Sequence, residues 1–286
     1  MKSLATRISI TLLLIGLISC SASSAEQTEA NTVTKPEQLP EVQSLINEEI
    51  HSVMPLDSPE VEMIPVNTLL GKIVQSKDVD FVRIDRKYTA KPAIYLRKEA
   101  YTAFEKMYAA AKLEGISLEI ISATRNFKYQ KGIWERKWTG VTKVGGKNLA
   151  ISLPDPVERA RAILRYSSMP GTSRHHWGTD IDLNSLNNSW FASGQGKKVY
   201  TWLQAHAAEF GYCQTYTHMD ESRPRGYQEE KWHWSYMPIA SKFLASYLTH
   251  VHVHDITGFK GAEAAKGMNV IQDFVGGVGP RCREWK

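Results

Sequence analysis

The interleaving of helix-like and strand-like segments is the feature that most constrains how this 286-residue chain can fold. From Arg97 to Lys112, apolar residues recur every three or four positions, which is the period of an amphipathic helix. Residues 117–122 alternate in part, as a half-buried strand does. By the same criteria we expect helices at 127–138, from Asp155-Pro156 onward and at 198–210, and short strands at 179–183 and 232–236. Because these segments lack regular βαβ spacing, the sequence predicts an α+β fold.

The N-terminal segment has the pattern of a secretory signal peptide. Two basic residues precede an uncharged, mostly apolar run at 8–19, which is short for a membrane span. The run ends in Leu-Ile-Ser-Cys, which resembles the bacterial lipobox and implies cleavage before Cys20 and lipidation of its thiol. Ordinary cleavage after Ala22 or Ala25, which would release a free soluble protein, is the alternative.

Three regions are therefore expected along the chain. Residues 1–19 form the signal peptide, and residues 20–43, which are rich in Ser, Ala, Glu, Thr and Pro, form a flexible tether. Residues 44–286 form one folded domain, because no second linker of similar length interrupts them. These features predict an exported protein in the periplasm or cell envelope, held to a membrane through Cys20, and we expect it to be a monomer.

Charge and cysteine content narrow the function further. The formal net charge of +5 is mild and does not indicate a dedicated nucleic-acid-binding protein. Only three cysteines are present, too few for a site of four thiolates. In an oxidising compartment, Cys213 and Cys282 could form a disulfide, and two unpaired buried thiols are the alternative.

Two segments concentrate side chains that can bind a metal, at 173–182 and 229–234. Together they offer the imidazoles and carboxylates of a catalytic zinc site, which uses three protein ligands and leaves a fourth position to water. Gly178 can turn the chain so that His175 and Asp182 point to one place. Asp180 and Asp182 share a strand face, so one can ligate while the other orients a ligand or binds substrate. Spacing alone leaves the metal open, because most such His and Asp pairs are structural.

Three motifs in a fixed order carry a family resemblance. Residues 122–130 match S-x-x-R-x-x-x-x-Q, residues 173–182 match S-x-H-x-x-G-x-x-x-D, and residues 230–233 match E-x-W-H. In this order they resemble the VanY/VanX-type zinc D-Ala-D-Ala peptidases (peptidase family M15), over about residues 80–239. We therefore expect a single compact α+β domain in which a small central antiparallel sheet carries the zinc site and helices flank it.

The resemblance also implies roles for individual residues. The zinc ligands would be His175, Asp182 and His233. Glu230 would be the general base, and Arg125 would stabilise the oxyanion or pair with the substrate carboxylate. The substrate-binding residues would be Ser173, Gln130 and Asp180. Two positions depart from the family pattern, since Ala123-Thr124 stands where Gly-Tyr is usual and Asp180 stands where a small residue is common.

These features predict a zinc carboxypeptidase that removes the terminal D-Ala of peptidoglycan stem peptides, with the choice between D,D and L,D bonds left open. One alternative is an endopeptidase of the same fold. Another is a non-catalytic cell-wall binding module, against which the complete set of ligands and base argues. A third is a metal carrier that uses a His-rich tail. That tail, at His250, His252 and His254, could form a second metal site if extended, and a set of solvated side chains is the simpler interpretation.

Overall fold

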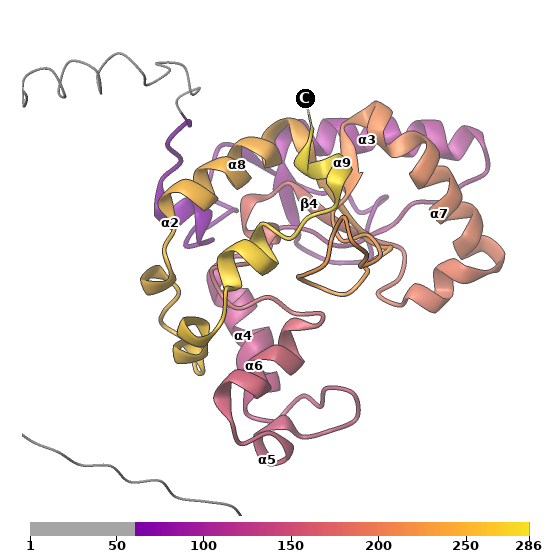
Figure 1. The fold of residues 1–286 in the computed structure, drawn as a ribbon. Coiled ribbons are helices and arrows are strands. Elements are labelled where there is room, and N and C mark those ends of the chain that lie inside the picture. Colours follow the sequence, from indigo (N-terminus) through magenta and orange to yellow (C-terminus); the bar gives the residue numbers. More distant parts are fainter. Residues whose placement is uncertain (1–60, 286) are drawn as a thin grey trace, which may run out of the picture. The chain divides into compact units, whose positions relative to one another are not determined.

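A four-stranded antiparallel sheet lies at the centre of the structure (Figure 1). The computed structural model describes residues 61–285, so the predicted signal peptide, tether, Cys20 and domain start at residue 44 lie outside the described residues. The strands run in the spatial order β3 (Ile120–Ser122), β4 (Asp180–Leu183), β6 (His233–Tyr236) and β5 (Tyr212–Gln214). The predicted α+β fold with a small antiparallel sheet is confirmed.

The two faces of the sheet differ in chemistry because successive side chains of a strand point to opposite sides. Asp182 pairs with His233, and Asp180 pairs with Ser235, so these polar side chains share one face. Ile181 pairs with Trp234 and points to the other face, which is apolar. The register of β4 and β6 thus gathers two carboxylates and an imidazole on the same side of the sheet.

Helices cover the apolar face and immobilise the strands. Helix α3 (Lys98–Leu113) and helix α7 (Gly194–His206) pack their buried sides on it (Figure 1). The shared core includes Phe104, Met107, Ile120, Ile181, Leu183, Val199, Trp202, Leu203 and Trp234. Because these side chains are almost fully buried, β4 and β6 are held in place from behind the polar face.

Other helices form a second hydrophobic core. It includes buried residues of α4 (Phe127–Trp138), α6 (Pro156–Leu164) and α8 (Met237–His250). Local capping explains two of the helix starts, since Asn126 accepts a hydrogen bond from the Tyr129 amide and Asp155 accepts one from the Glu158 amide. The helices predicted at 127–138 and from Asp155-Pro156 are confirmed.

Shorter elements complete the described residues. They are β1 (Phe81–Arg83), β2 (Tyr95–Arg97), α2 (Val66–Leu69), α5 (Leu149–Ser152) and α9 (Pro280–Arg283), with single turns η1 (Arg174–Trp177), η2 (Asn188–Ala192), η3 (Ala207–Phe210), η4 (Val253–Asp255), η5 (Ala262–Gly267) and η6 (Ile271–Val275). A disulfide joins Cys213 of β5 to Cys282 of α9. Within residues 61–285, no helix is long and apolar enough to cross a membrane.

Three predicted elements differ from the structure. The strand expected at 117–122 is limited to 120–122, because Asn184 leaves β4 with a φ of 61° and its side-chain amide bonds to the backbone of Ser117 and Glu119 instead. The helix expected at 198–210 is α7 from Gly194 to His206, followed by the turn η3. The three tail histidines are not in an extended segment, since His250 ends α8 and His254 lies in the turn η4.

Candidate metal centre and active-site cleft

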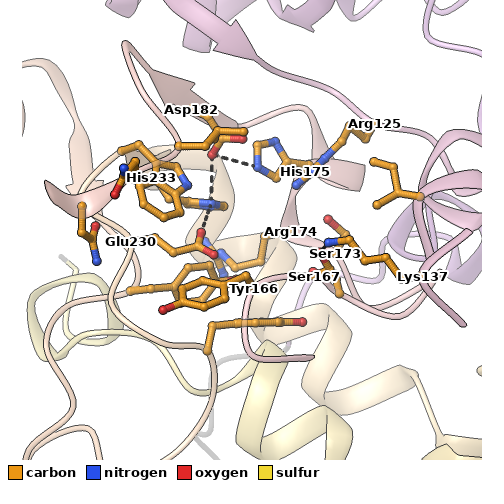
Figure 2. A pocket seen from close by; sticks show the side chains of 18 residues that line it. Arg125, Lys137, Tyr166, Ser167, Ser173, Arg174, His175, Asp182, Glu230 and His233 are labelled. Carbon is orange, nitrogen blue, oxygen red and sulfur yellow. Dashed lines mark hydrogen bonds and ion pairs between the residues drawn. The ribbon is translucent and has the colours of Figure 1, made fainter. Parts of the chain in front are cut away.

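Three buried side chains converge at the polar face of the sheet (Figure 2). His175 comes from η1, Asp182 from β4 and His233 from β6. The Oδ1 atom of Asp182 lies 3.3 Å from Nε2 of His175 and 3.3 Å from Nδ1 of His233. One potential ligand atom from each residue lies within 4.8 Å of the other two. The structure therefore brings together the three residues that the sequence proposes as metal ligands.

Local backbone geometry sets this convergence. Gly178 has a φ of +74°, a left-handed conformation that side-chain-bearing residues rarely adopt, and it turns the chain from η1 into β4. Arg97 stabilises the turn, because its amide donates to the Gly178 carbonyl at 2.9 Å and its Nε donates to the Trp177 carbonyl at 2.7 Å. The expected role of Gly178 as the turn between His175 and Asp182 is confirmed.

In each imidazole, the nitrogen that faces away from Asp182 (the outer nitrogen) has a hydrogen-bond acceptor. Nδ1 of His175 lies 2.8 Å from the Ala123 carbonyl, and Nε2 of His233 lies 2.7 Å from Oδ2 of Asp180. If each outer nitrogen carries the proton, the other nitrogens, Nε2 of His175 and Nδ1 of His233, present their lone pairs on the side of Asp182. Nε2 of His175 and Oδ1 of Asp182 are buried with no hydrogen-bond partner among the described residues. Two imidazoles and a carboxylate with lone pairs directed at one point fit a zinc ion.

The electrostatics of the site call for a positive charge. Burial alone would lower the pKa of His233, but the carboxylates of Asp180, Asp182 and Glu230 outweigh it and raise that pKa well above its usual value. Burial would likewise raise the pKa of Asp182, yet the facing imidazoles hold it well below its usual value. A proton on His233 or a bound cation can supply this charge, and a cation would also take up the lone pair of Nε2 of His175.

Glu230 lies beside the three predicted ligands. It precedes β6, and its Oε2 is 3.3 Å from Nδ1 of His233. Its amide donates to the Tyr216 carbonyl at 2.9 Å, which fixes its position against the end of β5. Burial raises the pKa of the Glu230 carboxyl, and His233 partly offsets that rise. A buried carboxylate of raised pKa at this position suits a general base.

Asp180 does not contact the cleft, which corrects its prediction as a substrate-binding residue. It is fully buried, and Oδ2 accepts from Nε of Arg174 at 3.2 Å and faces His233. Oδ1 accepts from the hydroxyls of Thr179 and Ser235, both at 2.7 Å. With its oxygens occupied in this way, Asp180 orients His233, which is the other role that its strand face allowed.

Gln130 is likewise absent from the cleft wall. Its side chain is fully buried, and Nε2 donates to the Ser168 carbonyl at 2.8 Å. It therefore supports the backbone of a cleft residue and does not itself reach a substrate. Ser173, in contrast, lines the cleft, and its hydroxyl is buried without a hydrogen-bond partner among residues 61–285.

The cleft has a volume of about 450 Å³. The metal-site residues and Glu230 lie together in its wall, and Arg125, Ser173, Ser167 and Lys137 lie on the other side of His175 (Figure 2). Trp232 and Trp234, which flank His233 in the sequence, both belong to the core behind the sheet, and Trp232 also lines the cleft. The cleft is therefore open to a ligand next to the three predicted metal ligands.

Two residues that sequence reasoning missed position the site. Arg174 is buried, pairs with Asp180 and donates from Nη2 to the Ser235 hydroxyl at 2.8 Å. His176 points away from the metal ligands, because its Nδ1 lies 2.5 Å from the Arg125 carbonyl and its Nε2 accepts from the Gly171 amide at 3.0 Å. Burial lowers the pKa of His176 to about 3. No local spacing signals these contacts, because Arg125 lies 51 residues from His176 in sequence.

The His-rich tail does not form a second metal centre in the described part of the chain. Across residues 61–285, the cluster with metal-ligand geometry is His175, Asp182 and His233. Nδ1 of His250 faces the Ser246 carbonyl at 3.0 Å, and the backbone amide of His252 donates to Asp255. The rings of His252 and His254 lie 5.3 Å apart, but His250 does not join them in a cluster with metal-ligand geometry.

Comparison with known proteins identifies a related family. The family model "VanY: D-alanyl-D-alanine carboxypeptidase" matches residues 93–239, just over half of the chain. This range contains all three motifs, from Ser122 to His233. It also contains the whole antiparallel sheet.

Individual relatives are more distant. A curated protein of Bacillus subtilis (strain 168), "Putative carboxypeptidase YodJ", is 29% identical over 149 residues, which cover 50% of this chain and 46% of that protein. A solved structure of the LD-carboxypeptidase LdcB is 23% identical, with a TM-score of 0.44 over 66% of this chain and 78% of that one. A variant of the D,D-pentapeptidase VanY in complex with Zn(II) is 21% identical, with a TM-score of 0.41 over 64% and 93%. The chain spans about half the length of the curated relatives that it matches.

Proposed function

The chain belongs to the VanY family of D-alanyl-D-alanine carboxypeptidases, and we propose that it is a zinc carboxypeptidase that removes the terminal D-alanine from peptidoglycan stem peptides. The observation that carries this proposal is the buried His175–Asp182–His233 cluster with Glu230 beside it, open to a cleft. The family supplies the substrate class, and the side chains supply the means of hydrolysis.

Each side chain has a task in this reaction. Zinc held by His175, Asp182 and His233 would supply a Lewis acid that activates water and polarises the scissile carbonyl. Glu230 accepts the proton of the attacking water and delivers it to the leaving amine. Its raised pKa helps the first transfer, since the carboxylate accepts the proton more readily than an exposed one would. Arg125 offers a permanently charged, planar donor to an anionic oxygen.

Membership of the family does not determine which peptide bond of the substrate is cleaved. The same zinc site serves a D,D bond in a pentapeptide or an L,D bond in a tetrapeptide, so we propose a carboxypeptidase and leave that choice to experiment. An endopeptidase would need a cleft that continues past the leaving residue. A purely binding module would not need Glu230 beside the metal site.

Incubation with purified stem pentapeptide and tetrapeptide, read by mass spectrometry, tests this function. We expect loss of one alanine from one of the two peptides, abolished by a chelator and restored by zinc. Glu230→Gln should retain zinc and lose about 10²- to 10⁴-fold in rate, the usual contribution of a general base. Full activity of the Glu230 variant would refute the assigned mechanism, and cleavage inside the peptide would favour the endopeptidase.

We also propose that the protein is exported and anchored through a lipid on Cys20. The support is the signal-like run at 8–19 followed by Cys20, together with the disulfide between Cys213 and Cys282, which suits an oxidising compartment. Membrane fractionation and mass analysis of the N-terminus should find the acylated protein in the membrane fraction. Cys20→Ala should move it to the soluble fraction, and an unchanged distribution would contradict lipidation.

A further inference from the structure

Lys137 is a second cation in the cleft, at a position that none of the three motifs includes. It lies near the end of α4, and its Nζ contacts the hydroxyl of Ser167. Arg125, Ser173, Ser167 and Lys137 lie together on one side of His175, away from Glu230 (Figure 2). The cleft therefore has one end rich in cations and hydroxyls.

The two cations have no counter-charge of their own. Neither Lys137 nor Arg125 has a carboxylate within ion-pair distance among residues 61–285. Burial lowers the pKa of the Lys137 amine, and the charge of Arg125 lowers it further, against a smaller opposing effect of Glu230. An anion between the two cations would relieve this repulsion and recover part of the cost of burial.

The hydrogen-bonding groups at this end match the same kind of ligand. The Ser173 hydroxyl and Nε of Arg125 are buried without partners in the described residues. Together with the amine of Lys137, they offer donors in excess, whereas an ionised carboxylate is an acceptor only. The carboxylate of Glu230 lines the cleft away from these donors (Figure 2), and the further lining residues Leu186, Asn187 and Asn188 carry no charge. The cleft is thus polarised, and a peptide with a free C-terminus has a preferred direction in it.

The order of the groups separates the roles of the two cations. Arg125 influences the pKa of His175 and of Glu230, and its amide donates to the His175 carbonyl at 3.1 Å, so it borders the metal site. Lys137 interacts with the charges of both Arg125 and Glu230, but its amine contacts the hydroxyl of Ser167 on the side of the cleft away from Glu230 (Figure 2). In a carboxypeptidase substrate, the terminal carboxylate lies one residue beyond the scissile carbonyl. The sequence of metal site, Arg125 and Lys137 therefore follows the order of reacting carbonyl and carboxylate.

The position of Lys137 is fixed by its helix. Trp134 and Trp138 on either side of it stack at 6.0 Å between ring centroids, and Nε1 of Trp134 donates to the Lys260 carbonyl at 2.9 Å. Both indoles are buried in the second core. The backbone of Lys137 is thus held rigidly, which reduces the entropic cost of placing its amine on a ligand.

We infer that Lys137, with Ser167 and Ser173, binds the terminal carboxylate of the peptide, which leaves Arg125 to stabilise the oxyanion at the scissile carbonyl. This inference rests on the proposed carboxypeptidase function and assigns the specificity for a free C-terminus to Lys137. It distinguishes two roles that the family resemblance leaves combined on Arg125.

The test compares two substrates and three variants. The substrates are the stem peptide with a free C-terminal carboxylate and the same peptide with a C-terminal amide. The variants are Lys137→Met, Lys137→Arg and, as a control of matched charge, Arg136→Met, whose side chain is exposed on the same helix outside the cleft. Reactions run at about 1 M salt, where a Debye length near 3 Å screens distant charges.

We expect Lys137→Met to raise KM for the carboxylate peptide by about 10- to 100-fold, the range for loss of a charge-assisted bond, with kcat changed only a few-fold. Its KM for the amide should stay close to that of the wild type, and Lys137→Arg should recover most of the preference for carboxylate. Arg136→Met should behave as the wild type. An unchanged KM, or an equal loss on both peptides, would overturn the inference.

A binding measurement separates this inference from the proposed function. Titration calorimetry of each peptide into zinc-loaded Glu230→Gln protein requires no turnover. The subsite is supported if this protein prefers the carboxylate peptide and loses that preference when it also carries Lys137→Met. This result would hold even if the wild type hydrolysed neither peptide, and then only the proposed function would fail. Equal binding of both peptides to the Lys137-containing protein would refute the subsite.

Discussion

Acceptors outside the ligand set determine which nitrogen each imidazole presents to the metal site. For His175 that acceptor is a backbone carbonyl, which no substitution removes, whereas for His233 it is the carboxylate of Asp180. Asp180 in turn neutralises Arg174, which is fully buried. A single carboxylate therefore orients a predicted ligand and balances a buried charge.

Asp180→Asn tests both consequences. Loss of the charge behind His233 should weaken zinc binding by about 10- to 100-fold, the usual effect of removing such a partner. Arg174 would be left without its counter-ion, and breaking a buried pair costs about 3–5 kcal/mol of unfolding free energy. Competition with a chromogenic chelator measures the first effect, and urea unfolding of the metal-free protein measures the second.

Ser235→Ala is the matched control for this substitution. The Ser235 hydroxyl donates to Asp180 and accepts from Arg174 but does not contact His233. Its removal should cost roughly 1 kcal/mol of unfolding free energy and leave zinc affinity within a few-fold. Equal losses of zinc affinity in both variants would mean that Asp180 acts through packing and not through His233.

Sequence reasoning identified the side chains that converge at the site, but not which of them are buried and bonded away from the cleft. Alternation along 179–183 places Asp180 and Asp182 on one face, and the structure has them there. The same pattern cannot show that Arg174 and Ser235 occupy the oxygens of Asp180, because Ser235 lies 55 residues away on another strand. Gln130 was misplaced for the same reason, since its partner is a backbone carbonyl 38 residues distant.

At the scale of secondary-structure elements, the turn at Gly178 connects two elements of the site. It joins η1, which carries His175, to β4, which carries Asp182. A Cβ atom at Gly178 would clash with the Phe81 ring, and its φ of +74° already disfavours any side chain. The elements on either side must therefore move if this glycine is replaced.

Gly178→Ala is expected to lower stability and zinc affinity together. The left-handed backbone costs about 1–2 kcal/mol, and the clash adds about 1–3 kcal/mol of unfolding free energy. Gly115→Ala is the control, because Gly115 has a φ of +72° with open space around it and should show only the first cost. Thermal unfolding and zinc titration compare the two, and equal losses would show that packing around Gly178 is unimportant.

The disulfide between β5 and α9 is a second link between elements. It closes a sequence separation of 69 residues, and β5 pairs directly with β6, which carries His233. Replacing both Cys213 and Cys282 by Ala should reduce the unfolding free energy by roughly 2–4 kcal/mol. Urea unfolding of the wild type in the presence of reductant should give nearly the same unfolding free energy as the double variant. If reductant does not change the urea midpoint of the wild type, the disulfide is contradicted.

Element prediction succeeded where local signals determine the outcome. Helices α4 and α6 begin at side-chain caps that can be read from the sequence. The strand at 117–122 depends on a tertiary partner instead, because Asn184 replaces strand pairing at one end of β3 and has no local signature there. The conformation of the histidines from 250 to 254 follows from local contacts, since α8 extends to His250.

At the scale of the whole molecule, basic side chains are concentrated near the cationic end of the cleft. Residues 125–165 hold ten of the 35 Lys and Arg residues but only three of the 30 Asp and Glu residues. This segment includes α4, α5 and α6, which lie together, apart from α7 (Figure 1). A field of one sign beside a cleft speeds the arrival of ligands of opposite sign. Stem peptides with free carboxylates are such ligands.

Charge reversal at Lys143 and Lys147 tests whether this field guides substrate. Both side chains are exposed in the loop between α4 and α5, outside the cleft. Lys143→Glu with Lys147→Glu should slow association of an anionic stem peptide several-fold at about 0.01 M salt, where the Debye length is near 30 Å. The dissociation rate should stay unchanged, because no contact with bound peptide is lost. Stopped-flow fluorescence of the cleft tryptophan in the Glu230→Gln background measures both rates.

The control carries the same change in net charge at a distant place. Lys197 and Lys198 are exposed on α7, so their reversal to Glu alters the total charge of the protein equally without altering residues 125–165. If the segment itself guides the peptide, this variant should associate nearly as fast as the wild type at low salt, and all three proteins should converge near 1 M salt. Equal slowing in both double variants would attribute the effect to net charge, and the uneven distribution of basic residues would then have no part in substrate capture.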